Sequence, residues 1–376
     1  MLIIKMPNNW KKYKLGEIIE LKRGYDLPEY SRINGDVPVY TSSGLNSFHN
    51  AAKVNGPGVI TGRYGTLGEF YYSEYDFWPH NTTLYVRNFN NNNPKFIYYF
   101  LKTLRFSHSN DKSGVPGLNR NDLHTIETEI PDIPTQTQIA SILSSLDDKI
   151  ELNLQMNQTL EAMAQAIFKE WFVNLNFPGF DGELVEGLPK GWRKEPIDAS
   201  IEFLNGLALQ KFPPESETDY LPVIKIRELR QGITNASDKA STKISRKYVI
   251  EDGDVLFSWS GSLDVVLWCE GKGALNQHLF KVSSDAYPKW FYYFWTKHYL
   301  SFYQSIAEGK ATTMGHIQRK HLTETIINVP DTLTLKDSNN IISPILDRII
   351  ENKVQIRTLT QLRDSLLPKL MTGKIE

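Results

Sequence analysis

Residues Pro94–Phe100 read PKFIYYF, and residues Pro288–Phe294 read PKWFYYF. In the first copy Asn93 can cap a helix, and Pro94 fits the first turn, where its missing N–H group costs little. Apolar side chains then recur at helical spacing. The sequence therefore predicts an aromatic helix that occurs twice, in a chain built from two related halves.

The rest of the chain repeats in the same order. Trp10 and Trp192 each stand three residues after a proline. Three longer matches follow along the chain: Val59–Leu67 with Val255–Leu263, Ile130–Asp132 with Val329–Asp331, and Asp148–Ile150 with Asp347–Ile349. A repeat of this length predicts a pseudo-symmetric molecule, because the repeats of a solenoid are far shorter. Such a molecule presents two similar surfaces that can be tuned separately, as an asymmetric two-part target would require.

The composition is that of a globular protein with 376 residues, of which 40% are hydrophobic and 23% are charged. This length is enough for two or more domains. The formal net charge is -1, so a DNA-binding role must rest on local cationic patches or on partner subunits. Cys269 is the only cysteine, which excludes a disulfide framework and favours a reducing, cytoplasmic location. Met1–Met6 is too short and too weakly apolar for a signal peptide, and no apolar run approaches membrane-spanning length.

The fold class that we expect is α+β, with two pseudo-symmetric mixed α/β domains separated by two long helices. The first domain covers residues 1–134, and a central helix follows over residues 135–178. The second domain covers residues 179–333 and opens with a connector rich in Gly and Pro. A second long helix occupies residues 334–376.

The two long segments carry matching series of contact residues that alternate four and three apart, as in a coiled coil. In the first segment these are Leu146, Ile150, Asn153, Asn157, Leu160, Ala164, Ile167 and Trp171. In the second they are Ile345, Ile349, Asn352, Ile356, Leu359, Arg363, Leu366 and Leu370. Asn352 falls on Asn153, and this match predicts that the helices pack on each other as an antiparallel coiled coil. The alternative is that each helix packs on its own globular domain. The second helix is expected to run from about Asp337, and because Pro can sit in a first turn, Pro344 also allows a start near Ser343.

The order of globular domain, long helix, globular domain and long helix resembles the specificity subunit of type I restriction-modification systems. Both globular domains open near a Pro-x-x-Trp sequence. The connector Phe180–Trp192 looks like the junction between halves in that family, and Thr137–Asn153 looks like the start of its central helical region. The resemblance covers nearly the whole chain and rests on an ordered set of motifs present twice. The second copy departs from the first where Thr332–Leu335 replaces the polar Thr135–Gln138 and where Arg363 stands at a contact position.

The resemblance implies two target recognition domains that each read one half of a split double-stranded DNA target. It implies that the helices are spacers and docking sites for methyltransferase subunits, expected to number two, and that restriction subunits join them. The chain itself is expected to be non-catalytic and to hold no cofactor, while its partners use S-adenosylmethionine, ATP and magnesium. The residues expected to serve the coiled coil and partner docking are Leu146, Ile150, Asn153, Leu160, Ile167, Ile349, Asn352, Ile356, Leu359 and Leu366.

The first candidate DNA-contacting loop is Gly62–Gly68, whose glycines permit a tight turn and a close approach to a backbone. Arg63, with Tyr64 beside it, can reach phosphate or guanine, and Thr66 can donate a hydrogen bond. The alternative is a plain β-turn. The second copy carries small polar residues and a tryptophan at the matching place, which favours a shared architecture with variable contacts: Ser258, Trp259, Ser260 and Ser262.

A second cationic loop follows the aromatic helix in each copy. Its candidates are Lys112, Asn119 and Arg120 in the first copy, and Lys310, Thr312, Thr313, Gln318, Arg319 and Lys320 in the second. Arg and Lys suit phosphate contact, whereas Asn and Gln can read adenine. The alternative is a solvated loop. Asn81–Thr83 and Asn276–His278 occupy matching strand starts, where they can read bases or equally satisfy buried backbone groups.

Two other function classes are weaker. The chain lacks the Asn/Asp-Pro-Pro-aromatic motif of adenine methyltransferases and the phosphate loop of a motor. Pro131-Asp132 followed by Asp147-Asp148-Lys149 imitates a metal-dependent nuclease signature, but the second part falls inside the predicted helix, where it does not face the first. The eight histidines show no ligand spacing, so no metal site is expected. A coiled-coil scaffold without DNA binding is a third reading, and the matched cationic loops argue against it.

Overall fold

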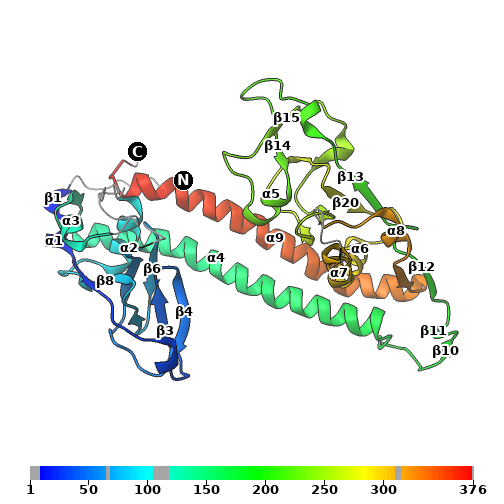
Figure 1. Ribbon diagram of the computed structural model, residues 1–376, viewed down its shortest axis with the longest axis horizontal. Helices are drawn as coiled ribbons and strands as arrows, with labels where there is room; N and C mark the ends of the chain where they lie inside the picture. The colour runs from blue at the N-terminus through cyan, green and yellow to red at the C-terminus, as the bar shows by residue number, and fades with distance from the viewer. Residues whose placement is uncertain (1–8, 65–67, 105–117, 310–314, 375–376) are drawn as a thin grey trace. The chain divides into compact units, whose positions relative to one another are not determined.

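The structure is a computed structural model that describes residues 9–64, 68–104, 118–309 and 315–374. The chain forms two compact units (Figure 1). Unit 1 comprises residues 1–149 with 359–376, and unit 2 comprises residues 150–358. Each unit therefore consists of one globular domain together with segments of both long helices.

The globular part of unit 1 is built on a four-stranded sheet of order β2-β8-β5-β6. Two smaller sheets flank it, one of β1 and β9 and one of order β4-β3-β7. The strands are β1 (Lys11–Lys14), β2 (Glu20–Arg23), β3 (Val37–Thr41), β4 (Gly44–His49), β5 (Gly58–Gly62), β6 (Phe70–Ser73), β7 (Trp78–Pro79), β8 (Thr83–Asn88) and β9 (Glu127–Ile130). The helices are α1 (Leu15–Ile18), α2 (Pro94–Thr103) and α3 (Arg120–His124), with a 3-10 turn η1 (Glu29–Ser31).

The globular part of unit 2 is built on the sheets β13-β20-β17-β18 and β15-β14-β19-β16, with a separate β12–β21 pair and the small β10–β11 hairpin. Its strands are β10 (Leu184–Val185), β11 (Leu188–Pro189), β12 (Arg193–Pro196), β13 (Glu202–Asn205), β14 (Leu221–Ile224), β15 (Lys239–Ala240), β16 (Val249–Ile250), β17 (Val255–Ser258), β18 (Asp264–Leu267), β19 (Gly273–Leu275), β20 (Leu279–Ser283) and β21 (Ile326–Val329). Its helices are α5 (Ile226–Gln231), α6 (Lys289–His298), α7 (Leu300–Glu308) and α8 (Arg319–Thr323), with the 3-10 turns η3 (Leu209–Lys211) and η4 (Arg246–Tyr248).

The two globular parts share one topology. The order β2-β8-β5-β6 corresponds to β13-β20-β17-β18, and the pair β1–β9 corresponds to β12–β21. Strand β3 pairs antiparallel with β4 and parallel with β7, just as β14 pairs antiparallel with β15 and parallel with β19. The duplication that the sequence predicts is therefore confirmed for these strands, while β10, β11 and β16 of unit 2 have no counterpart among the named strands of unit 1.

The repeated aromatic helix is the centre of each core. Helix α2 starts at the predicted cap, because the Phe96 backbone N–H donates to Asn93 Oδ1 over 3.0 Å. Phe96 in α2 and Trp290 in α6 are both fully buried. Burying one such side chain stabilises a fold by roughly 1.5–3 kcal/mol, so the helix that the two sequences share is a main source of core stability in each unit.

The long helices are α4 (Ile133–Phe168), which continues into a π-helical turn η2 (Lys169–Val173), and α9 (Thr332–Leu370). An aspartate caps each of them. Asp132 Oδ1 accepts from the Thr135 backbone N–H over 3.1 Å, and Asp331 Oδ1 accepts from those of Leu333 and Thr334 over 2.9 and 3.1 Å. The carboxylates satisfy N–H groups that have no partner within the helix and complement its dipole.

The second helix starts earlier than about Asp337, and the alternative start near Ser343 is wrong. The helix begins at Thr332, and Pro344 lies inside it. An interior proline removes one backbone hydrogen bond and costs about 3 kcal/mol or more. The cap at Asp331 and the burial of Ile342 and Leu346 in the core of unit 2 offset that cost.

The two helices run antiparallel where they meet within unit 2, because rising numbers in α4 face falling numbers in α9. Asn153 Nδ2 donates to Gln355 Oε1 over 2.7 Å, and Asn352 Nδ2 donates to Asn157 Oδ1 over 2.9 Å. All sixteen predicted contact residues of the two series are buried or half-buried. The predicted coiled-coil packing is confirmed.

The alternative packing also contributes within each unit. Ile139 and Leu143 of α4 belong to the core of unit 1, and Phe168 belongs to the core of unit 2. Each helix thus contacts both a helical partner and the globular part beside it. In the part of the chain that the structure describes, no helix is long and apolar enough to span a membrane.

Candidate nucleic-acid interface

The first candidate loop is held by the same backbone hydrogen bonds in both units. In unit 1 the Arg63 N–H donates to the Thr82 carbonyl over 2.9 Å, and the Leu118 N–H donates to the Arg63 carbonyl over 2.9 Å. In unit 2 the Trp259 N–H donates to the His278 carbonyl over 3.4 Å, and the Ile317 N–H donates to the Trp259 carbonyl over 3.0 Å. Arg63 and Trp259 therefore occupy equivalent positions, and each lies beside the segment that follows the second candidate loop.

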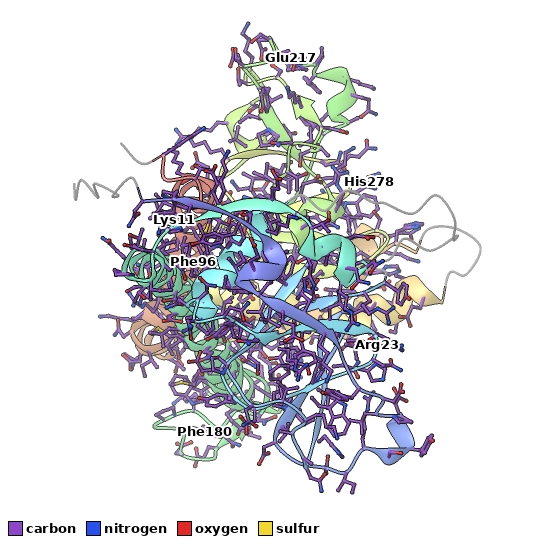
Figure 2. All side chains as sticks on the ribbon, turned by 90° about the vertical axis from the view of Figure 1, so that its left-hand side faces the viewer. Lys11, Arg23, Phe96, Phe180, Glu217 and His278 are labelled. Atoms are coloured by element: carbon purple, nitrogen blue, oxygen red, sulfur yellow. The ribbon has the colours of Figure 1, made fainter. Side chains whose placement is uncertain are left out.

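In unit 1 this surface is cationic and aromatic. Arg63 Nη2 donates to Tyr64 Oη over 2.9 Å, and the guanidinium lies 4.8 Å from the centre of the tyrosine ring. Arg23 ends strand β2 (Figure 2), and its Nε donates to the Asn81 carbonyl over 3.2 Å. Arg120 is exposed, and among the described residues no hydrogen bond or ion pair holds its side chain. Such guanidinium groups suit phosphate oxygens or the acceptors of guanine.

In unit 2 the same place is aromatic. The Trp259 ring lies 5.9 Å from the ring of His278 (labelled in Figure 2) and 5.8 Å from that of Phe280. Arg319 lies 5.8 Å from the centre of the Phe280 ring, and its Nη2 donates to the Phe203 carbonyl over 3.2 Å. Trp259, Phe280 and Arg319 line a hollow of about 370 Å³ together with Asn205, His316, Ile317 and Gln318. The equivalent backbone positions thus carry different chemistry.

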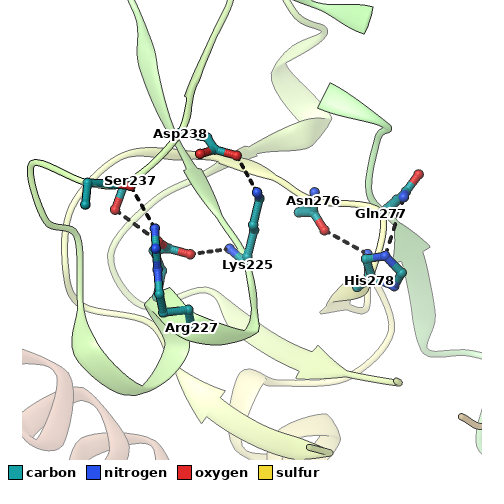
Figure 3. A network of polar contacts seen from close by, with 9 residues as sticks. Lys225, Arg227, Ser237, Asp238, Asn276, Gln277 and His278 are labelled. Atoms are coloured by element: carbon teal, nitrogen blue, oxygen red, sulfur yellow. Dashed lines mark hydrogen bonds and ion pairs between the residues drawn. The ribbon is translucent and has the colours of Figure 1, made fainter. Parts of the chain in front are cut away.

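A larger hollow of about 930 Å³ borders His278 on the side of strand β14. Figure 3 shows part of its polar lining, where Lys225 pairs with Asp238 and Arg227 Nη2 lies 2.7 Å from Glu228 Oε1. Lys239 also lines this hollow, and its Nζ lies 2.5 Å from Glu217 Oε2, so each lysine and arginine of the lining has an acidic partner. The lysine partner holds the pKa of Asp238 below its usual value. Because these cations are already neutralised, this hollow is a weaker phosphate site than the surface around Arg63.

The sequence matches the family model of the type I restriction modification DNA specificity domain twice, at residues 7–162 and 189–364. The chain belongs to this family. It is similar to the MjaIX specificity subunit of Methanocaldococcus jannaschii, with 25% identity over 75% of this chain and 69% of the relative. It is 24% identical to the HindI specificity subunit of Haemophilus influenzae, over 98% of this chain and 100% of the relative. The type I restriction-modification S subunit from M. genitalium has the same fold, with a TM-score of 0.68, 16% identity and 98% coverage of both chains.

These similarities confirm the family that the repeated motifs indicated, and they make the chain a DNA sequence-recognition component, not a catalytic one. The two family matches also agree with the duplication, since each covers one globular part and a portion of the helix that follows it.

Two predicted contact residues of this specificity chain have structural roles instead. Ser258 is fully buried, and its hydroxyl donates to the Ser262 carbonyl over 2.7 Å and accepts from the Asp264 N–H over 2.8 Å. Ser260 is buried, and its Oγ lies 3.0 Å from His278 Nδ1. Ser258 therefore closes the turn after β17, and Ser260 positions the histidine. The sequence could not show that these two serines are buried. Side chains alternate between the two faces of a strand, and which face is covered is known only from the fold.

The remaining candidates divide into three groups. Tyr64, Asn119, Arg120, Ser262, Gln318, Arg319 and Lys320 are exposed, and Arg63 and Trp259 are half-buried. The Asn119 side chain also caps α3, because its Oδ1 accepts from the Asn121 N–H over 3.0 Å. Five candidates lie outside the described residues: Thr66, Lys112, Lys310, Thr312 and Thr313.

Arg23 and Asn205 are further candidate interface residues, which the sequence analysis missed. Each is the last residue of a strand and is followed by a glycine, and this shared pattern could have identified them from the sequence. The strand register also changes one sequence match. Thr83 pairs with Gly62 as Leu279 pairs with Ser258, so Thr82 corresponds to His278 and Asn81 to Gln277.

The nuclease-like residues of this chain serve the helices. Asp132 caps α4, and hydrogen bonds from Thr135 hold the pKa of its carboxyl below the usual value. Asp147 lies four turns further along the same helix and accepts a hydrogen bond from Tyr99 Oη over 2.6 Å. At about 1.5 Å per residue the two carboxylates are roughly 22 Å apart along the helix, which is too far to share a metal ion. The described residues contain no group of three or more His, Cys, Asp or Glu side chains that could hold one.

Proposed function

We propose that this chain reads a split, asymmetric double-stranded DNA target, with the globular part of unit 1 reading one half and that of unit 2 the other. The main support for this proposal is that the two units form the same backbone hydrogen bonds around the first candidate loop but carry different side chains there. Arg63 and Trp259 sit at equivalent positions on equivalent backbones. Two similar domains with different reading residues suit two different half-sites, which lie on the order of one helical turn apart.

The net charge of the chain favours a contribution of the partner subunits to its affinity for DNA. The chain has a net charge of -1, so it carries no overall excess of positive charge. Phosphate neutralisation supplies much of the affinity of DNA-binding proteins. The isolated chain is therefore a weak DNA binder whose affinity rises when cationic partner surfaces join it.

We assign methylation of a target adenine and cleavage of DNA to partner subunits. In this proposal two methyltransferase subunits using S-adenosylmethionine dock on the chain, and restriction subunits using ATP and magnesium join them. The predicted docking residues face the neighbouring helix, since Asn153 and Ile349 are buried. Docking therefore uses apolar side chains on the outward faces of the helices, which are about half exposed: Leu152, Leu154 and Met163 in α4, and Ile341 and Leu362 in α9.

A domain exchange tests the division of labour. Residues 1–134 are replaced by the corresponding domain of a specificity subunit with a known target, and the methylated motif is read in a host that supplies the methyltransferase. The proposal expects one half-site to change and the other to stay. A change in both halves, or in neither while the hybrid chain is present and soluble, overturns it.

A further inference from the structure

We propose that specificity is carried by three equivalent positions in each unit, at the ends of three neighbouring strands. These reading positions are Arg23, Arg63 and Thr82 in unit 1, and Asn205, Trp259 and His278 in unit 2. The inference rests on the proposed function, because it names the residues through which each unit distinguishes bases.

The strand register brings the three positions to one end of the sheet. Strand β8 is antiparallel to β2 and β5, so it begins where they end. Arg23 pairs with Leu84, and Arg63 directly follows Gly62, which pairs with Thr83. In unit 2, Asn205 pairs with Phe280 and Ser258 pairs with Leu279, which places Trp259 and His278 in the same relation. The three residues of each set therefore lie at the same end of the sheet.

The backbone at this edge is fixed while the side chains vary. The Gly24 N–H donates to the Thr83 carbonyl over 3.1 Å, and the Gly206 N–H donates to the Leu279 carbonyl over 3.1 Å. A Cβ added at Gly24 would lie 2.1 Å from the His80 carbonyl oxygen, and one at Gly206 would lie 2.2 Å from that of Asn276. Only glycine permits this approach of the two chain segments. A rigid frame with exchangeable side chains is what precise base reading needs.

In unit 1 the reading chemistry is that of two guanidinium groups. The Thr82 hydroxyl is already engaged, since it lies 3.1 Å from His80 Nδ1 and accepts from the Ser42 N–H over 3.3 Å. Arg23 and Arg63 keep N–H groups beyond those they donate to Asn81 and Tyr64. A guanidinium binds the O6 and N7 atoms of guanine through two hydrogen bonds, the commonest specific contact in the major groove. Unit 1 is expected to require guanine in its half-site.

In unit 2 the three side chains support one another. Trp259 Nε1 donates to Asn205 Oδ1 over 3.0 Å, which leaves the Asn205 amide N–H groups to donate. Ser260 Oγ lies 3.0 Å from His278 Nδ1, and the other ring nitrogen, Nε2, lies 3.4 Å from Gln277 Nε2, so the imidazole is held in place by a neighbour on each side. Amide and imidazole groups of this kind read base edges in the grooves, and the Trp259 ring adds apolar contact. The half-site of unit 2 is therefore expected to differ from that of unit 1.

The test uses the full chain in complex with its methyltransferase and a library of duplexes with randomised half-sites, scored by sequencing of methylated adenine. Arg63→Lys keeps the positive charge but loses the two-pronged donor. The expected result is a loss of about tenfold or more in base discrimination at one position of the first half-site, since a two-pronged contact contributes that order of selectivity. His278→Ala is expected to relax one position of the second half-site. Arg87→Ala, an exposed arginine elsewhere in unit 1, is the matched control and leaves both halves unchanged.

The outcomes separate this inference from the proposed function. If the unaltered complex methylates no split motif, the proposed function fails. If the unaltered motif is split but Arg63→Lys and His278→Ala keep every preference, the assignment of reading positions is wrong while the function stands. A uniform loss of methylation on all sequences, in variants whose thermal unfolding is unchanged, makes these residues phosphate contacts and also overturns the assignment.

Discussion

Arg363 Nη1 lies 2.8 Å from Asp147 Oδ1, and this ion pair joins α9 to α4 inside unit 1. Asp147 also accepts a hydrogen bond from Tyr99. The positions 199 residues away in the repeat are Ala164 and Leu346, which are both buried in the core of unit 2. In unit 1 the charged residue at the helix contact position, Arg363, is therefore paired with an acidic residue. In unit 2 the two equivalent positions hold apolar side chains instead.

The ion pair predicts a specific pattern of stability. Arg363→Ala leaves the half-buried Asp147 carboxylate without its cation and is expected to cost about 1–3 kcal/mol. The double variant Asp147→Leu with Arg363→Ala copies the apolar arrangement of unit 2 and is expected to recover most of that loss. Urea unfolding followed by circular dichroism measures both. Equal destabilisation of the single and double variants would contradict this role of the pair.

The buried asparagines of the coiled coil predict a second effect. Asn352 donates to Asn157, whose Nδ2 donates in turn to the Ile349 carbonyl over 3.3 Å. Asn352→Ala leaves the buried Asn157 oxygen unsatisfied and is expected to lower the free energy of unfolding by about 1–3 kcal/mol. Replacing both asparagines by leucine is expected to raise thermal stability while relaxing the helix register.

Hydrogen exchange along α4 and α9 measures that relaxation. Ser144→Ala on α4, a residue whose hydroxyl bonds only to the neighbouring Ser141 carbonyl among the described residues, serves as the control. A double-leucine chain that is less stable than Asn352→Ala would exclude this explanation.

Acid is expected to weaken the attachment of α9 to the globular part of unit 2. Arg357 donates to both carboxylate oxygens of Asp252, over 2.6 and 2.8 Å, and holds the pKa of that carboxyl below its usual value. A depressed folded-state pKa contributes stability that is present above the unfolded value of about 3.9 and is lost as the pH falls through the folded value. Asp252→Asn should therefore lower the melting temperature at pH 7, and this difference should shrink below about pH 4.

The control for this pH effect is Asp285→Asn. Asp285 is exposed, and its side chain has no hydrogen bond or ion pair within the part of the chain that the structure describes. A difference between Asp252→Asn and the unaltered chain that stays constant from pH 7 to pH 3 would show that the carboxylate charge does not stabilise this contact.

Salt is expected to govern DNA binding by the isolated chain. The affinity of the chain for duplex DNA should be weak and should fall steeply between about 50 and 200 mM salt, since its contacts are mainly to phosphate until partners join. Fluorescence anisotropy with a labelled duplex measures this. Tight, salt-insensitive binding by the chain alone would contradict the proposal that partner subunits supply much of the affinity for DNA.

The sequence predicted the parts of the fold that follow from periodicity and repetition. The aromatic helix, the duplicated order and the contact positions of the long helices all depend on local spacing, and Asn153 and Asn352 were placed correctly. The start of α9 was predicted wrongly because Pro344 is a local helix breaker, whereas the cap at Asp331 and the burial of Ile342 are tertiary features. Those features outweigh local propensity.

The interface was harder to predict because its residues meet only through strand pairing. Arg23 ends β2 and Arg63 directly follows β5, and β8 lies between these two strands in the sheet. No spacing in the sequence shows that the two arginines lie at the same end of the sheet. Ser258 was a candidate because serine is polar, yet the pleat directs its side chain into the core. Residue type alone could not distinguish a turn-closing hydroxyl from one available to DNA.

The most direct measurement is sequencing of methylated adenine in a host that expresses this chain with and without its methyltransferase. The predicted result is a split, asymmetric motif that appears only when both are present, with a guanine in the half-site that Arg63 controls. A motif that appears without this chain, or a continuous motif that survives exchange of residues 1–134, would contradict the reading of two half-sites by two units.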